Sequence, residues 1–139
     1  MDAAAALADL TEISSQLEAA VVFTDDGAVV ASTFGDETRT ERLRRAGNGL
    51  LEAAETLPSS TGRTLTRLEA ALPIGSVFVT RSEGVAIVAT TTPAPASTLV
   101  FHDLEACLRA VAEAQVAEEP AAERPKRPRA PRKKKTPDA

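Results

Sequence analysis

Apolar residues recur at spacings of three and four in three stretches of the chain, which is the pattern of an amphipathic helix. These stretches are residues 3–17, about 37–57 and about 97–118. Pro58 ends the second stretch, because proline cannot continue a helix. Ser97 is placed to cap the third, since a serine hydroxyl can accept a bond from a free helix amide. The pattern predicts three helices.

Five shorter apolar runs, several of them rich in valine, predict strands. They lie at residues 19–24, 28–32, 65–72, 76–80 and 85–91. Asp25, Asp26 and Gly27 separate the first two runs, and a short acidic segment ending in glycine is typical of a hairpin turn. Turn geometry therefore explains the two aspartates without a metal or a carboxylate pair. The first two strands are expected to pair antiparallel.

The predicted order is α-β-β-α-β-β-β-α, an α/β (α+β) fold with a five-stranded antiparallel sheet between helices. The runs at 19–23 and 85–89 are continuously apolar, which is typical of central strands covered on both faces. The other three strands are expected outside them. The strand at 65–72 is then an edge, and its unpaired backbone needs either protection or a partner strand.

Composition limits the chemistry available to this chain. Of its 139 residues 43% are apolar, but 27 are alanine, four are phenylalanine, and tryptophan and tyrosine are absent. His102 and Cys107 are the single histidine and cysteine, and at five residues apart on one helix they cannot form a nucleophile–base pair. No phosphate-binding glycine loop is present. We expect no catalytic residue, no cofactor and no metal site.

Charge divides the chain into an acidic domain and a basic tail. Residues 119–139 carry eight basic and three acidic side chains, a net charge of +5, which leaves −9 on residues 1–118. The tail is too polar to fold alone and is expected to be disordered. It is expected to contact nucleic acid or another polyanion, or to act as a linker or contact the acidic domain, through Arg124, Lys126, Arg127, Arg129, Arg132, Lys133, Lys134 and Lys135. A cytoplasmic protein without a membrane span is predicted.

The helix at 37–57 has Gly47 and Gly49 at its middle, where each glycine costs about 1 kcal/mol relative to alanine. Small residues there would let a helix of a second copy approach closely. The alternative is a loosened helix that packs only on its own sheet. With the edge strand beside it, the predicted dimer interface comprises Ala46, Gly47, Gly49, Leu50, Leu65, Leu68 and Ala70.

The same helix carries Arg42 and Arg45 on one face, and Glu41 can pair with Arg45 at a spacing of four. A solvated, salt-bridged surface accounts for this pattern. The alternative is a docking surface for an acidic partner.

The sequence resembles the Roadblock / dynein light chain family over residues 3–115. The resemblance is carried by an L-x-x-L helix, the strand–DDG–strand element AAVVFTDDGAVVAS, the helix end LLEAAETL and the meander GSVFVTRSEGVAIVATT. Longin and profilin-like domains share this layout. The resemblance implies that the helix at 37–57 covers one face of the sheet and the other two helices cover the opposite face. It also implies dimers that join strand 65–72 to its copy and helix 37–57 to its copy.

The resemblance further implies a function without catalysis. Members form homodimeric or heterodimeric platforms that bind small Ras-like GTPases, and this composition is most similar to the prokaryotic GTPase-partner type. By that analogy Arg42, Arg45 and Asn48 are the candidate contacts with the GTPase. The alternative hypothesis is a nucleic-acid-associated dimer that binds phosphates through its basic tail.

Overall fold

The computed structural model describes residues 2–57 and 67–117 and contains the eight predicted elements in the predicted order. They are α1 (Ala3–Ile13), β1 (Leu17–Thr24), β2 (Val29–Ser32), α2 (Glu37–Glu55), β3 (Arg67–Leu72), β4 (Gly75–Ser82), β5 (Val85–Thr91) and α3 (Ser97–Ala117). Leu65, predicted to belong to the third strand, and the predicted loop at 59–63 lie outside the described residues.

The five strands form one antiparallel sheet in the order β2-β1-β5-β4-β3. The prediction that the two continuously apolar runs are central is confirmed, because β1 and β5 pair with each other along their length. Val21 and Val88 are partners in this pairing, and both are fully buried. β2 and β3 form the two edges of the sheet.

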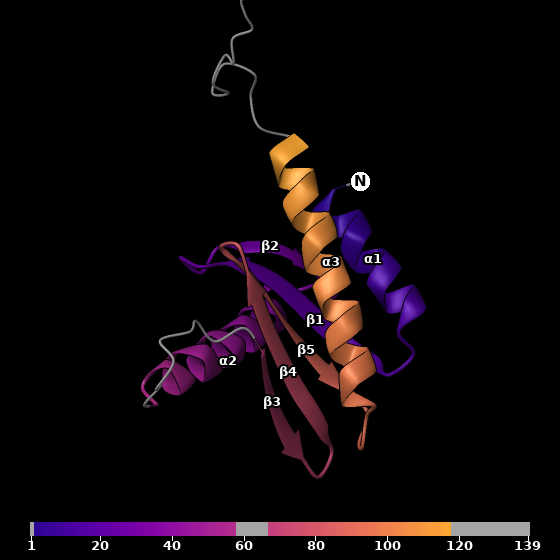
Figure 1. Ribbon diagram of the computed structural model, residues 1–139, viewed down its shortest axis with the longest axis vertical. Helices are drawn as coiled ribbons and strands as arrows, with labels where there is room; N and C mark the ends of the chain where they lie inside the picture. The colour runs from indigo at the N-terminus through magenta and orange to yellow at the C-terminus, as the bar shows by residue number, and fades with distance from the viewer. Residues whose placement is uncertain (1, 58–66, 118–139) are drawn as a thin grey trace, which may run out of the picture.

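Helices cover both faces of the sheet, as the resemblance implied (Figure 1). α1 and α3 lie side by side on one face, over a core that contains Leu10, Phe78 and Leu104. α2 lies on the other face, over a smaller core centred on Phe23 and Val88. The alternating side chains of β1, β4 and β5 supply both cores, which explains the continuously apolar runs of β1 and β5.

One predicted helix boundary and one predicted helix cap are wrong. The first helix ends at Ile13 and not at residue 17, because Leu17 is taken into β1, where it pairs with Thr91. Ser97 does not precede the third helix as a cap. It is the first residue of α3, and its hydroxyl donates a hydrogen bond of 2.8 Å to the Glu69 carboxylate on β3. In both places a tertiary contact overrides a local signal.

The acidic segment between β1 and β2 is a tight turn, as predicted. Gly27 has a φ of 93°, a conformation that favours glycine. The Asp26 carboxylate accepts hydrogen bonds from the Thr24 hydroxyl and the Ala28 amide. These bonds, the hydroxyl first, lower the pKa of Asp26, so both the charge and the glycine stabilise the turn.

Cys107 is a buried residue of α3 that packs against α1. Its sulfur lies 3.7 Å from the Ala6 carbonyl oxygen, and burial raises the pKa of the thiol to about 11. His102 is exposed. The two side chains point in different directions, Cys107 into the core and His102 into solvent, as their spacing predicts.

Within residues 2–57 and 67–117, no helix is long and apolar enough to cross a membrane. In the same part of the chain, no three His, Cys, Asp or Glu side chains are grouped so that they could hold a metal ion.

Candidate functional site

The inner face of α2 packs tightly on the sheet at Gly47. A Cβ added at Gly47 would lie 2.7 Å from the Cβ of Val88 and 3.0 Å from both of its Cγ atoms. The glycine thus allows α2 to rest directly on the central strand β5. The prediction that Gly47 opens the helix to a second chain is corrected here, because its close neighbour belongs to its own sheet. For Gly47 the alternative interpretation holds, in which the helix packs on its own sheet.

The outer face of α2 is a different surface with small residues of its own. Ala46 and Gly49 are exposed, and a Cβ added at Gly49 would meet nothing within 4 Å. Ala53, also exposed, continues the same helical stripe. Sequence reasoning missed Ala53, although its spacing of seven from Ala46 placed it on the same face.

The apolar face of β3 is only partly covered. α2 packs mainly on β1, β5 and β4, and it leaves Leu68 and Ala70 half-buried at the edge of the sheet. Leu72, on the same face, is 52% exposed. Leu50 and Leu68 both pack against the core beneath α2, so the two elements border one surface. We call this the α2–β3 surface; it comprises Ala46, Gly49, Leu50, Ala53, Leu68, Ala70 and Leu72.

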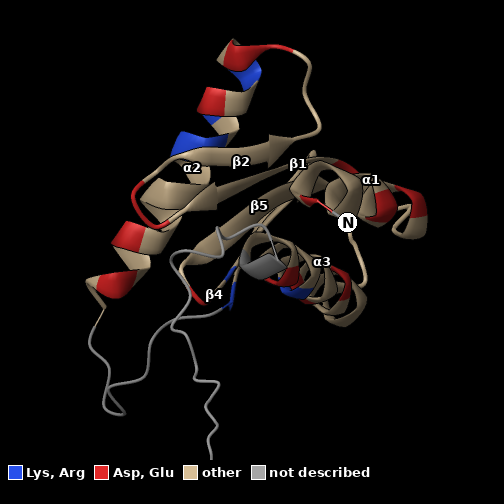
Figure 2. Cartoon of the chain, turned by 90° about the horizontal axis from the view of Figure 1, so that it is seen from above, with Lys and Arg blue, Asp and Glu red and all other residues tan. Residues whose placement is uncertain are grey.

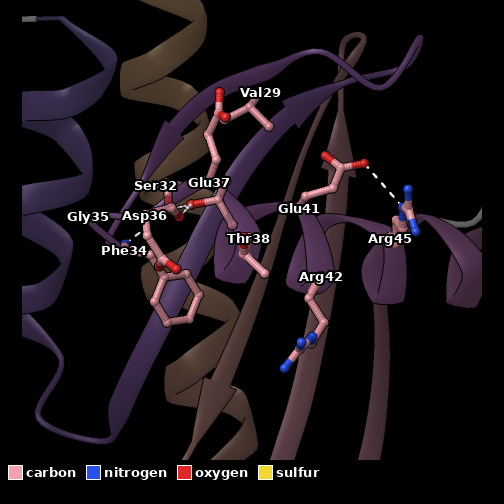
Figure 3. A pocket seen from close by; sticks show the side chains of 11 residues that line it. Val29, Ser32, Phe34, Gly35, Asp36, Glu37, Thr38, Glu41, Arg42 and Arg45 are labelled. Atoms are coloured by element: carbon pink, nitrogen blue, oxygen red, sulfur yellow. Dashed lines mark hydrogen bonds and ion pairs between the residues drawn. The ribbon is translucent and has the colours of Figure 1, made fainter.

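A groove of about 880 Å³ lies on the other side of α2, between its first turns and β2 (Figure 3). Arg42 and Arg45 both line it, as do Val29 and Phe34 from the β2 side. We call it the arginine groove. The structure therefore brings together two of the three predicted partner contacts.

Glu41 binds two arginines of α2 at the rim of the arginine groove. Its carboxylate accepts hydrogen bonds from Arg44 at 2.5 and 3.0 Å and from Arg45 at 3.2 Å. Arg42 is exposed, and among the described residues no salt bridge reaches it. In Figure 3 its side chain points away from the Glu41–Arg45 pair. Arg42 is thus the arginine that is available to an external carboxylate.

Asn48, the third predicted contact, lies elsewhere. Its side-chain amide donates to Glu52 at 3.1 Å, and it lines a separate pocket of about 160 Å³ with Asp25 and Arg81. Arg81 forms an ion pair of 2.5 Å with Glu55 in that pocket. The predicted trio is therefore divided between two surfaces.

The hydrogen bond from Arg44 is the largest cause that lowers the pKa of Glu41 to about 2. We expect Arg44→Gln to raise that pKa towards the ordinary value of 4.5, measured by the side-chain carboxyl signal of Glu41 in an NMR pH titration. Because the folded value is depressed, ionised Glu41 favours the folded state above about pH 4.5, and this contribution is lost as the pH falls towards 2. Arg39→Gln is the control, since Arg39 pairs with Asp36. An unchanged midpoint in Arg44→Gln would contradict the assignment.

No protein-family model matches the sequence, and no curated protein matches it. Its structure, however, is similar to that of a Roadblock/LC7 domain from Streptomyces avermitilis, with a TM-score of 0.73 and 13% identity. The similarity covers 84% of this chain and 99% of that chain. The chain has the Roadblock/LC7 fold. The fold that the sequence resemblance implied is therefore confirmed.

Two further structures share the Roadblock/LC7 fold with this chain. The gliding protein MglB from Thermus thermophilus has a TM-score of 0.67 at 16% identity, over 84% of this chain and 88% of that chain. A structure of MglB with a tetrameric arrangement has a TM-score of 0.68 at 15% identity, again over 84% and 88%. Identities this low establish the fold alone.

The basic tail, residues 119–139, lies outside the described residues. This applies to each of its eight predicted polyanion contacts. A nucleic-acid role for the tail therefore stays a prediction.

Proposed function

We propose that this chain is a member of the Roadblock family that forms a dimer and binds a small Ras-like GTPase. It acts as a non-catalytic platform that modulates the nucleotide cycle or the location of that GTPase. The observation that carries the proposal is the α2–β3 surface, an apolar and small-residue face left open beside an edge strand.

The α2–β3 surface has the features of a two-fold interface. Joining β3 to β3 of a second copy extends the sheet and gives the exposed backbone groups of both edges a partner. The same operation brings the two α2 helices alongside each other. Exposed Ala46, Gly49 and Ala53 permit a close approach, because the distance between packed helices depends on the size of the side chains between them. The tetrameric arrangement of one MglB structure supports self-association in this fold.

The arginine groove is the proposed contact with the GTPase. Each copy in a dimer contributes one groove, next to the α2 helices that the family resemblance assigns to partner docking. Arg42 provides a positive charge with no salt bridge among the described residues, whereas Arg45 is shared with Glu41. An acidic surface of the partner would pair first with Arg42. The dimer that binds the GTPase is either a homodimer or a heterodimer with a paralogue.

We expect Arg42→Glu to raise the Kd for the GTPase at least tenfold, about 1.4 kcal/mol, because it reverses a charge at the docking surface. The measurement is isothermal titration with a purified small Ras-like GTPase, loaded with GDP or with a non-hydrolysable GTP analogue. Arg109→Glu is the matched control, since Arg109 is exposed on α3, on the opposite face of the sheet.

Two outcomes argue against the proposed function. If the wild-type protein binds neither nucleotide form of the GTPase, the proposed partner is wrong. If the Arg42→Glu and Arg109→Glu variants bind equally well, the arginine groove is not the docking site.

A further inference from the structure

A second groove lies between α1 and α3, on the face of the sheet opposite the α2–β3 surface. It has a volume of about 200 Å³ and an apolar floor formed by Ala6, Leu10, Cys107 and Ala110. Asp9 lines it from α1 and Asp103 from α3. Ile13, at the end of α1, closes the groove and is 71% exposed. We call this the α1–α3 groove.

The carboxylates around this groove lack counter-charges. Within residues 2–57 and 67–117, no salt bridge reaches the two lining carboxylates, Asp9 and Asp103. None reaches Glu12 either, an exposed residue of α1 that does not line the groove but precedes Ile13. Helix α1 contains no basic residue at all, and Figure 2 shows red segments along it but no blue. Helix α2, by contrast, carries four arginines and four glutamates, and salt bridges join arginines to Glu41, to Glu55 and to Asp36 at its N-cap. The body of the protein thus balances charge around α2 and leaves the α1–α3 face negative.

The basic groups of α3 do not offset this charge. The pKa of Glu105 is lowered first by its hydrogen bond from Arg67, and also by the charges of Arg109 and His102. Both groups therefore lie near Glu105, which forms an ion pair of 2.6 Å with Arg67 on β3. That side of α3 faces the sheet edge and not α1.

The missing positive charge is present in the sequence immediately after α3. All four lysines of the chain, Lys126, Lys133, Lys134 and Lys135, lie in residues 119–139, within a segment of net charge +5. α3 ends at Ala117, at the same end of the molecule as the N-terminus of α1 (Figure 1). The tail therefore follows α3 about 10 Å beyond Ala110, the α3 residue of the groove that is nearest to this end of the helix.

The tail is long enough to span the groove. From Ala117 back to Asp103, α3 is about 21 Å long at 1.5 Å per residue. A proline-containing segment spans about 3.1 Å per residue, so the nine residues from Ala117 to Lys126 reach about 28 Å. Lys126 can thus reach Asp103 at the far end of the groove. The three consecutive lysines, Lys133 to Lys135, lie further along the tail and can reach the same carboxylate.

We propose that residues 119–139 dock in the α1–α3 groove of their own chain. The basic side chains of the tail pair with Asp9, Glu12 and Asp103, and its prolines and the alkyl stems of its lysines cover the apolar floor and Ile13. Docked in this way, the tail shields the negative face of the domain and is withheld from external polyanions. This inference does not depend on the GTPase or on the dimer.

The test exploits the confinement of lysine to the tail. In the full-length protein, a water-soluble carbodiimide joins carboxylates to lysines, so every lysine cross-link reports a contact of the tail. Mass spectrometry of the digested protein is expected to find most cross-links at Asp9, Glu12 and Asp103. Cross-links to Glu37 and Glu83 are expected to be rare. Salt at 0.5 M should reduce these cross-links about fivefold, because exposed charge pairs are screened. A mixture of ¹⁴N- and ¹⁵N-labelled chains should give cross-links within one chain only.

The variant Asp9→Asn/Asp103→Asn provides a second readout. Cross-links to the unaltered Glu12 should fall about threefold in this variant, because the tail loses two of its partners. Glu37→Gln/Glu83→Gln removes the same charge at exposed positions away from the groove and should leave Glu12 cross-links unchanged.

Three results would overturn the proposal. The first is an even distribution of cross-links over all exposed carboxylates. The second is a predominance of mixed-isotope cross-links, which would place the tail on another copy. The third is an absence of tail cross-links together with salt-sensitive binding of a short DNA duplex, which would favour the nucleic-acid role instead.

Discussion

Gly47→Ala is expected to destabilise the protein by about 1–2 kcal/mol, although alanine is the better helix former. The added Cβ would lie 2.7 Å from the Cβ of Val88, an atom fixed to the backbone of the central strand β5. Val88 is fully buried and cannot move aside, so α2 must lift from the sheet and loosen the core beneath it. This cost exceeds the gain of about 1 kcal/mol in helix propensity.

Gly49→Ala is the matched control, because it makes the same change two residues away on the same helix. Nothing in its own chain lies within 4 Å of its added Cβ, so we expect a single copy to be stabilised by about 0.5–1 kcal/mol. Urea unfolding of both variants measures the difference at one low protein concentration that favours single copies, since dimerisation makes stability depend on concentration and Gly49 lies in the proposed interface. In a Val88→Ala background the cost of Gly47→Ala should shrink, because the two Cγ contacts at 3.0 Å are gone. Equal effects of the two glycine substitutions would contradict the packing described for Gly47.

Ala46→Glu/Ala53→Glu is expected to convert the proposed dimer to a monomer and to raise its dissociation constant at least a hundredfold, about 2.7 kcal/mol. Both alanines are exposed on the outer face of α2, so the fold of a single copy should tolerate the change. Across a two-fold axis, each new carboxylate would approach its own copy in a closely packed interface. Like charges that meet as they lose water are strongly unfavourable.

Sedimentation equilibrium and light scattering of wild-type and variant protein provide the measurement. Ala4→Glu/Ala8→Glu is the matched control, because both residues are exposed on α1, on the opposite face of the sheet. Circular dichroism confirms that each variant is folded. A wild-type protein that is monomeric at high micromolar concentration would contradict the proposed dimer. A double variant that still dimerises would place the interface on another surface.

Hydrophobic periodicity predicted the architecture well because each element obeys a simple burial rule. The continuous apolar runs in β1 and β5 could only be satisfied between two layers of helices, and that is where they lie. The DDG segment specified its turn through the glycine at φ 93°. Boundaries were less predictable. Leu17 fits a helical stripe as well as a strand, and its pairing with Thr91 decides between them.

The candidate site was predictable in its elements but not in the direction of each side chain. Arg42 and Arg45 meet in one groove, as their spacing of three predicts, yet Asn48, another three residues along, lines a different pocket with Asp25 and Arg81. Three residues turn a helix by about 300°, which is about 60° short of a full turn. Positions 42, 45 and 48 therefore shift step by step from one side of α2 towards the other. Where one surface ends and the next begins depends on the strand beneath the helix.

By itself, the sequence determined the order of the elements, the central strands and the charge division between domain and tail, because these follow from local periodicity and composition. It also marked Gly47 and Gly49 as unusual residues in a helix, but it could not tell them apart. Only the tertiary structure separated their roles, since the rotation of α2 about its axis places Gly47 against Val88 and Gly49 in solvent. That rotation is set by packing between segments far apart in the chain, which no local pattern encodes.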